Sequence, residues 1–319
     1  MPLPSSTQGW AHSTCTVEML QKVLNDSAIT AIESDLLMGR DTFSTIQDDG
    51  SSNNELVPIM AHPPERESDL SASRFLDMVT DAGSRKAEKL LKKHIKLDFK
   101  EMETVQPVLE EARSVHCNGK TIFLNADILP GPGRTEEDIA LPPELFLEAC
   151  LSVMKARDRQ QQTSFALSLG FKVDVVHLFG HTDDQVSQMK TLMERYELME
   201  RSAGVVLAIN ARLLSKRLHV FDAFLEKYTK SQLLVWTGTG EPPISERKVR
   251  NIRRHFEAKG TFARVGFDCQ TCALLPMGAL YDTAIFVLGT WKLAKRTARA
   301  CTKKILGKRS ALTEKDKHQ

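Results

Sequence analysis

The chain has 319 residues, of which 41% are hydrophobic and 26% charged, a composition typical of one large or two small globular domains. The formal net charge is only +2, so the molecule as a whole is not expected to bind nucleic acid. The charge is unevenly placed, however, because residues 291–310 carry eight lysines and arginines and no acid. This segment predicts contact with an anionic membrane surface or, alternatively, a helix packed on the domain with a solvated charged tail.

Targeting signals and cysteines suggest a location for the protein. Residues 1–15 lack the basic and apolar regions of a secretory signal, and the apolar stretch 273–291 contains a proline and an aspartate, which makes it a poor bilayer span. The six cysteines are scattered, and one C-x-x-C pair at 269 and 272 lacks a second pair of zinc ligands. These features predict reduced thiols and a cytoplasmic protein that contacts a membrane only peripherally.

Strand-like and helical patterns alternate along most of the chain. The strand-like runs lie at 9–13, 29–37, 56–62, 94–100, 121–129, 163–171, 203–212, 231–238 and 261–268. Helical patterns lie at 71–93, 142–159, 187–202, 245–260 and 280–306, and the segment between residues 37 and 56 has the composition of a loop. No glycine-rich nucleotide-binding motif interrupts the pattern.

This alternation predicts a parallel α/β fold, and about eight units predict a closed TIM-type (β/α)8 barrel. A doubly wound open sheet is the alternative. Nine candidate strands compete for eight positions, so one of them must lie outside the barrel. We expect the barrel domain over residues 1–275, followed by a basic helical segment and a disordered tail over 276–319.

Two carboxylates interrupt the apolar stretch AIESDLL at residues 31–37. Glu33 and Asp35 are two residues apart, so in a β-strand both side chains project from the same face. Two like charges on a core strand repel each other and are costly to desolvate. A bound cation would offset that cost.

Polar residues also alternate with apolar ones in HIKLDFK, at residues 94–100. His94, Lys96, Asp98 and Lys100 fall on one face of the predicted strand, and three apolar residues fall on the other. An exposed edge strand would explain this pattern equally well. A strand that turns its polar face toward an active site is the second explanation.

Two further runs carry polar side chains near or at their C-terminal ends. In TIFLNADIL, at residues 121–129, Asn125 and Asp127 share a face, and the run 56–62 ends in His62 before two prolines. Active sites of barrels lie at the C-terminal ends of the strands, so the recurrence predicts one site built from several strands.

A cation is the simplest way to neutralise the acids of such a site. Glu33, Asp35 and Asp98 come from two separate strands and offer only oxygen ligands. Hard oxygen donors favour Mg²⁺ or Ca²⁺ over Zn²⁺, so a divalent cation of this kind is the expected cofactor.

A family resemblance rests on motifs that occur in a fixed order over residues 8–270. They are AHS at 11–13, IESD at 32–35, IMAHPP at 59–64, IKLDFK at 95–100, LNADILPGP at 124–132, SLGF at 168–171 and VWTG at 235–238. In this respect the chain resembles the menorin family. That family in turn resembles the phospholipase-C-like phosphodiesterase superfamily, which includes glycerophosphodiester phosphodiesterases. The resemblance implies a TIM-type barrel and metal-dependent hydrolysis of a phosphodiester.

The resemblance also implies roles for individual residues. Catalytic roles fall on His12, His62 and Lys100, and metal ligation falls on Glu33, Asp35 and Asp98, with Asp98 standing where those enzymes place a glutamate. The candidate substrate contacts are Lys96, Asn125, Asp127 and Trp236, although the strand around Trp236 favours a packing role. AHS lacks the Arg-Gly that follows the first histidine in many phosphodiesterases, and Phe171 stands where the family commonly has tryptophan. Both departures leave the substrate open.

The chemistry of phosphodiester cleavage fits these residue types. A cation, with Lys96 or Lys100, would neutralise charge on the non-bridging oxygens, and His12 and His62 suit the acid and base tasks near neutral pH. The sequence leaves open which histidine is the acid, and whether the nucleophile is water or a substrate hydroxyl. The expected substrate is a small-molecule or lipid phosphodiester. The alternatives are a catalytically silent barrel that acts as a binding or scaffold protein, and a hydrolase of another class that uses the same carboxylates.

Overall fold

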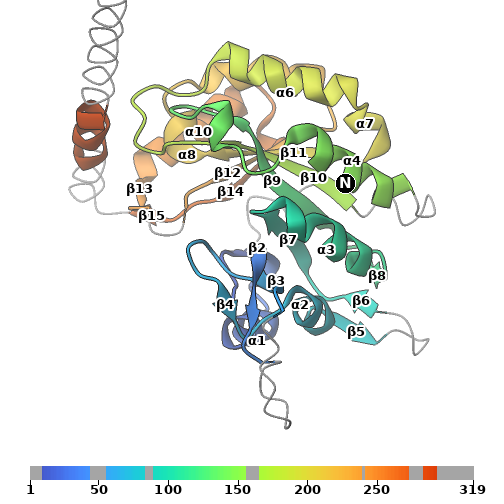
Figure 1. The fold of residues 1–319 in the computed structure, drawn as a ribbon. Coiled ribbons are helices and arrows are strands. Elements are labelled where there is room, and N and C mark those ends of the chain that lie inside the picture. Colours follow the sequence, from blue (N-terminus) through green and yellow to red (C-terminus); the bar gives the residue numbers. More distant parts are fainter. Residues whose placement is uncertain are drawn as a thin grey trace, which may run out of the picture.

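The computed structural model describes residues 9–43, 55–82, 89–155, 165–238, 241–272 and 283–292. Its main sheet has ten strands, eight of which are hydrogen-bonded in the order β1-β2-β7-β9-β10-β11-β12-β14 (Figure 1). These strands are β1 (Gly9–Ala11), β2 (Ile29–Asp41), β7 (His94–Phe99), β9 (Ile122–Pro130), β10 (Phe165–Lys172), β11 (Val205–Asn210), β12 (Gln232–Trp236) and β14 (Val265–Asp268). Each neighbouring pair in this order is parallel.

The two end strands of this sheet meet. His12 directly follows β1, and its Nδ1 lies 3.0 Å from Oδ2 of Asp268, the last residue of β14. The strand order follows the chain without the reversal that a doubly wound sheet requires. The predicted parallel α/β barrel is therefore confirmed as a nearly closed eight-stranded barrel, and the doubly wound alternative is wrong.

The ninth candidate strand lies outside the barrel. β3 (Val57–Met60) runs antiparallel to the C-terminal half of β2, and β4 (Glu67–Ser68) pairs with the last two residues of β2. Because β2 pairs with these two short strands, it continues to Asp41, well past the point where a loop was predicted. Alternation of apolar residues cannot distinguish such an antiparallel excursion from a barrel strand.

The long helix predicted over residues 71–93 is wrong. The chain forms the short helix α2 (Ala72–Met78) and then β5 (Thr80–Ala82) and β6 (Lys89–Leu91), which join β8 (Val115–His116) in a separate three-stranded sheet. The Thr80 hydroxyl donates hydrogen bonds to the carbonyls of Leu76 and Asp77, which satisfies the last turn of α2 and ends it.

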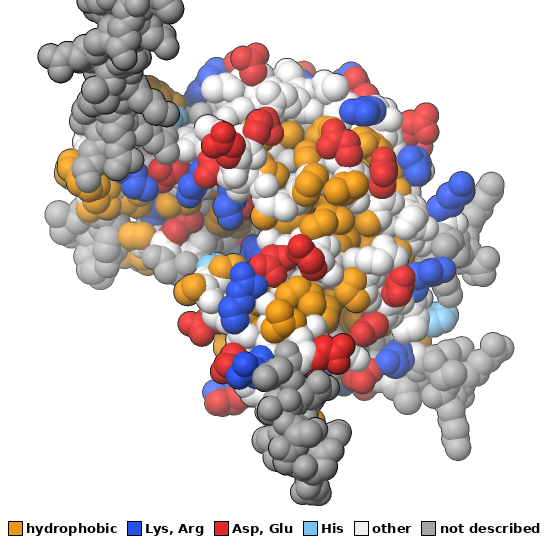
Figure 2. Space-filling view, in the orientation of Figure 1, with side chains coloured by type: hydrophobic (Ala, Val, Ile, Leu, Met, Phe, Trp, Pro, Cys, Tyr) orange, Lys and Arg blue, Asp and Glu red, His pale blue; other side chains and the backbone are white. Residues whose placement is uncertain are grey.

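The helical stretches predicted at 142–159, 187–202 and 245–260 are confirmed with shifted bounds. The stretch 280–306 is helical over 283–292 and otherwise lies outside the described residues, and four further described helices occur in stretches that were not named as helical. The helices besides α2 are α1 (Val17–Asn25), α3 (Val105–Ala112), α4 (Pro143–Lys155), α6 (Asp183–Arg195), α7 (Leu198–Arg201), α8 (Ala211–Leu214), α9 (Asp222–Lys227) and α10 (Glu246–Ala258), and a further helix covers 283–292. Among the described residues, no helix has the length and apolar character needed to cross a bilayer. On the face drawn in Figure 2, acidic and basic side chains are interspersed rather than segregated.

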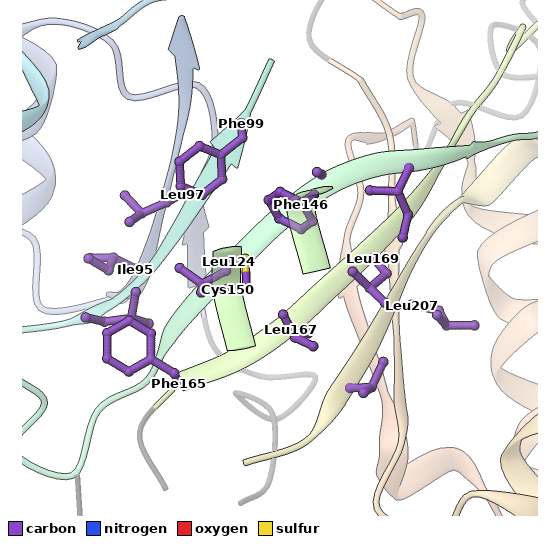
Figure 3. Packing of buried hydrophobic residues seen from close by; sticks show 14 of the residues in the cluster. Ile95, Leu97, Phe99, Leu124, Phe146, Cys150, Phe165, Leu167, Leu169 and Leu207 are labelled. Carbon is purple, nitrogen blue, oxygen red and sulfur yellow. The ribbon is translucent and has the colours of Figure 1, made fainter. Parts of the chain in front are cut away.

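The barrel strands carry apolar side chains outward, toward the helices. Ile95, Leu97 and Phe99 of β7 are buried on that side, and the Phe99 ring packs edge-on against Phe146 of α4 with 5.8 Å between centroids (Figure 3). The inward-facing positions alternate with these and so are free for other side chains. A small apolar layer inside the barrel consists of Phe123, Ala166, Val206 and Leu234, with Trp10 packed against it.

Candidate functional site

A cavity of about 240 Å³ opens where the barrel strands end. All ten residues predicted for the site line it: His12, Glu33, Asp35, His62, Lys96, Asp98, Lys100, Asn125, Asp127 and Trp236. The apolar layer inside the barrel thus gives way to polar side chains at the carboxyl ends of the strands, the location at which barrel enzymes carry their active sites. The structure brings the predicted residues together, and their roles stay predictions.

A larger depression of about 680 Å³ lies elsewhere, between the ends of α6 and α9. Part of its charge is already paired, because Lys227 forms an ion pair with Glu194 and the Tyr228 hydroxyl donates to the same carboxylate at 2.7 Å. This depression therefore offers less unusual chemistry than the barrel cavity, whose ionisable groups are buried.

Three buried carboxylates converge in the barrel cavity. Glu33 and Asp35 project from β2 and Asp98 projects from β7, where Asp35 and Asp98 are direct partners in the strand register. One oxygen from each carboxylate lies within 4.8 Å of the others. Three ligand oxygens at this spacing fit around one divalent cation, whose bonds to oxygen are about 2.0–2.6 Å long.

Two lysines neutralise part of this acidic cluster. Lys100 Nζ lies 2.8 Å from both Asp35 Oδ1 and Asp98 Oδ2, and Lys96 Nζ lies 4.0 Å from Glu33 Oε1. Burial by itself lowers the pKa of Lys100, but the charges of Asp98 and Asp35 outweigh it and raise the pKa well above its usual value.

The pKa values of two of these carboxylates are shifted in opposite directions. Burial is the main reason that the pKa of Glu33 is raised, and the charge of Asp35 adds to it while Lys96 acts against it. Burial also acts to raise the pKa of Asp98, but Lys100 and Lys96 outweigh it and hold that pKa below its usual value. The two strands therefore present carboxylates of different basicity to the same cavity.

Two carboxylates lie close to the same ring nitrogen of His12. Its Nδ1 lies 3.0 Å from Asp268 Oδ2 and 3.4 Å from Glu33 Oε2. Burial lowers the pKa of His12, but the hydrogen bond to Asp268 and the charge of Glu33 outweigh it, and the net pKa is raised. With Nδ1 engaged in this way, Nε2 is the ring nitrogen available for a proton transfer.

The turn after β1 fixes the position of this histidine. Ser13 has a φ of 54°, in the left-handed region, and its backbone N–H donates to Glu33 Oε2 at 2.6 Å. Its hydroxyl donates to Asp35 Oδ2 at 3.0 Å. Ser13 thus ties the turn to both carboxylates of β2, and an uncommon backbone conformation at such a point is typical of functional sites.

His62 reaches the cavity from the excursion outside the barrel. It follows β3, its side chain is exposed, and its Nδ1 lies 2.8 Å from the carbonyl oxygen of Pro63. The backbone N–H of Ala61 donates to the carbonyl of Asp35 at 3.0 Å, which holds this loop against the end of β2. Unlike His12, His62 has no carboxylate partner within hydrogen-bond distance among the described residues, so no acidic group orients its ring.

The polar side chains of β9 depend on small residues in β10. The Ser168 hydroxyl donates to Asn125 Oδ1 at 2.5 Å. Gly170 stands beside Asp127, and a Cβ atom at this glycine would lie 2.1 Å from Asp127 Oδ1. Burial raises the pKa of Asp127 to about 6, against the lowering effect of Lys100. The SLGF motif therefore makes room for the LNAD motif.

Several residues of the site were not identified from the sequence. Asp268 ends β14, and the rule that found the other acids at strand ends applies to it as well. Arg134, Lys172 and Glu241 also line the cavity. Glu241 Oε1 accepts from Asn210 Nδ2 at 2.9 Å, and its position in a loop gave no periodic signal.

The fold and the site together define a parallel α/β barrel with a buried acidic cluster, and an imidazole beside it, at the carboxyl ends of the strands. Residues 6–269 match the Menorin N-terminal domain, and the chain belongs to the menorin family. Protein FAM151B of Homo sapiens is 28% identical over 256 residues, which cover 79% of this chain and 80% of that protein.

A solved structure also overlaps with this chain. It is a putative vitamin-B12 independent methionine synthase from Listeria monocytogenes, which covers 84% of this chain and 81% of its own at 11% identity. The TM-score is 0.36, which is too low to support a shared fold or function.

Proposed function

We propose that this protein is a metal-dependent phosphodiesterase-like hydrolase with a barrel of the phospholipase-C-like type. The observation that carries the proposal is the convergence of Glu33, Asp35 and Asp98 within 4.8 Å, beside an imidazole that Asp268 orients. Buried carboxylates that share a cavity with an oriented histidine are the groups that metal-assisted hydrolysis requires.

Glu33, Asp35 and Asp98 are the residues that would hold the cation. The donor set consists of oxygen atoms, which suits Mg²⁺ or Ca²⁺. When bound, the cation would supply positive charge to the non-bridging oxygens of a phosphodiester. The net charge of the cavity fits such a ligand pair, because five carboxylates and four lysine or arginine side chains line it. A divalent cation and a singly charged phosphodiester would together balance the one excess negative charge.

The chain's own residues would move the protons and hold the substrate. His12 is the oriented acid or base, with Nδ1 on Asp268 and Nε2 free to transfer a proton. His62 is the second imidazole that lines the cavity, and its exposure lets it exchange protons with water. We expect Arg134 and Lys172 to contact the phosphate, since both are cations that line the cavity.

A thermal-shift titration with Mg²⁺ and Ca²⁺ tests the metal site, with wild type and Glu33→Gln compared in the same buffer. The wild type should be stabilised by the cation and Glu33→Gln should not, because a ligand that binds only the folded state raises its stability. Hydrolysis of glycerophosphodiesters and phospholipids is then measured for wild type and His12→Ala. Loss of turnover in His12→Ala with an intact metal response supports the proposal, and equal metal responses in wild type and Glu33→Gln contradict it.

A catalytically silent barrel that binds a partner is the second candidate. Lys100 Nζ, at 2.8 Å from both Asp35 and Asp98, and Lys96 Nζ, at 4.0 Å from Glu33, supply two positive charges to the three carboxylates without an ion. The one carboxylate charge left over could be removed by protonation of Glu33, whose pKa is raised chiefly by burial, so the cluster could be stable without a metal. Absence of both a metal response and turnover in the wild type would favour this candidate.

A further inference from the structure

The helix at 283–292 is attached to the rim of the barrel through one face. Ile285 and Gly289 are buried on that face, four residues apart, and Lys292 Nζ lies 3.2 Å from Asp174 Oδ1. A Cβ atom at Gly289 would lie 2.3 Å from the carbonyl oxygen of Val176. The contact therefore depends on a glycine that lets the two backbones approach closely.

The segment after β10 has the candidate site on one side and this helix on the other. Val173 and Val175 line the cavity that holds the acidic cluster. Asp174 and Val176, which alternate with them, line a small crevice together with Gly289 and Lys292 of the helix. The helix thus lies directly behind the wall of the candidate site.

The remaining surface of the helix is apolar and exposed. Among the described residues, nine large hydrophobic side chains are exposed, and five of them gather here: Phe179, Phe286, Val287, Leu288 and Trp291. Their exposed fractions run from 49% to 62%. Hydrophobic side chains gather at the same position in Figure 2, where the helix of Figure 1 lies. A helix that is apolar on nearly all sides is normally covered, so this group of five, which we call the apolar rim, needs an occupant.

We propose that the apolar rim docks on an anionic lipid surface. Residues 291–310 continue directly from it and carry eight lysines and arginines with no acid, so apolar and cationic residues follow each other as they do in segments that bind anionic bilayers. Trp291 stands at the junction of the two, where an amphipathic ring suits the membrane interface. A second copy of the chain is a less suitable partner, because the eight basic residues of one copy would lie near the eight of the other.

The docking identifies a class of substrate. Because the helix and the cavity share the segment 173–176, a bilayer under the apolar rim would lie beside the mouth of the candidate site. The substrate class is then the phosphodiester of a membrane lipid headgroup. This assignment rests on the proposed function, whereas the docking itself does not.

Co-sedimentation with vesicles tests the docking in EDTA, so that metal binding and turnover play no part. The full chain is mixed with phosphatidylcholine vesicles that do or do not contain phosphatidylserine. The wild type should bind the anionic vesicles, and added salt should weaken binding because it screens the cations. The variant Phe286→Ser, Val287→Ser, Trp291→Ser should bind at least tenfold more weakly, while Leu145→Ser, an exposed leucine on α4, should bind as the wild type does.

The outcomes separate this inference from the proposed function. Vesicle binding by Glu33→Gln that equals that of the wild type supports the docking even when no phosphodiester is hydrolysed. A wild type that does not bind, or a triple variant that binds as strongly, overturns it. So does a wild-type dimer in solution that the triple variant converts to a monomer, because the occupant is then a second copy.

Discussion

A buried histidine away from the candidate site should make the stability of the barrel depend on pH. His181, in the segment between β10 and α6, is 1% exposed, and its ring packs against Phe171 and Phe221 with centroids 4.8 Å and 5.5 Å away. Within the described chain neither ring nitrogen has a hydrogen-bond partner. Burial lowers the pKa of His181 to about 3.

The sign and size of the effect follow from this pKa. An unfolded histidine titrates near pH 6.5, so below that pH the unfolded chain binds a proton that the folded chain rejects. The contribution of neutral His181 to stability is complete above about pH 6.5 and is lost as the pH falls toward about 3. The slope is about 1.4 kcal/mol per pH unit, which amounts to about 2 kcal/mol between neutral pH and pH 5.

Urea unfolding at pH 7.5 and at pH 5, followed by circular dichroism, measures this difference. The variant His181→Leu keeps an apolar group of similar size between the two rings and removes the titrating nitrogen. Between pH 7.5 and pH 5 the free energy of unfolding of this variant should fall by about 2 kcal/mol less than that of the wild type. His219→Leu, at an exposed histidine, is the matched control and should behave as the wild type does. Equal losses in the wild type and in His181→Leu would refute the reasoning.

Three further predictions concern the candidate site. Lys100→Met leaves carboxylates without their nearest cation, so we expect a loss of about 2–3 kcal/mol in EDTA that Ca²⁺ restores, measured by urea unfolding. Gly170→Ala forces Asp127 to move and should cost about 1–3 kcal/mol in the same measurement. Asp268→Asn loosens His12, so turnover of a phosphodiester should fall about a hundredfold while the thermal shift with metal stays as in the wild type.

Each of these three has an outcome that contradicts it. Failure of Ca²⁺ to stabilise Lys100→Met more than the wild type would argue against a cation among the acids. Gly204→Ala is the control for Gly170→Ala, because a Cβ atom there would meet only Lys230 O at 3.5 Å, and equal losses in the two variants would remove the special role of Gly170. Full activity in Asp268→Asn would show that His12 needs no orienting partner.

Local alternation was enough to predict most barrel strands and the inward direction of their polar residues. In HIKLDFK the side chains of Lys96 and Asp98 do share the cavity face, while Ile95 and Leu97 are buried on the other side. The period of two in the sequence is the period of a strand, and the closed sheet turns one face inward along its whole length. The exposed-edge explanation of this stretch is wrong, since β7 lies between β2 and β9.

Contacts between distant residues could not be predicted in the same way. Strand pairing between β6 and β8 overrode the helical periodicity of residues 71–93, because that pairing depends on a partner elsewhere in the chain. Asp268 meets His12 across 256 positions, and although Asp268 stands at a strand end, no local pattern indicates that it pairs with His12. Glu241 entered the cavity from a loop, where spacing carries no signal.

The seam of the barrel has a consequence of its own. Among the described residues no backbone ladder joins β1 to β14, and the pair His12 and Asp268 bridges the two strands instead. This one side-chain contact therefore bridges the two end strands of the barrel and also contains a proposed reactive group. A change in the protonation of that imidazole, or a ligand that displaces it, is expected to weaken the contact between the first and last barrel strands. The closure of the barrel and the proposed reactivity would then depend on the same pair of residues.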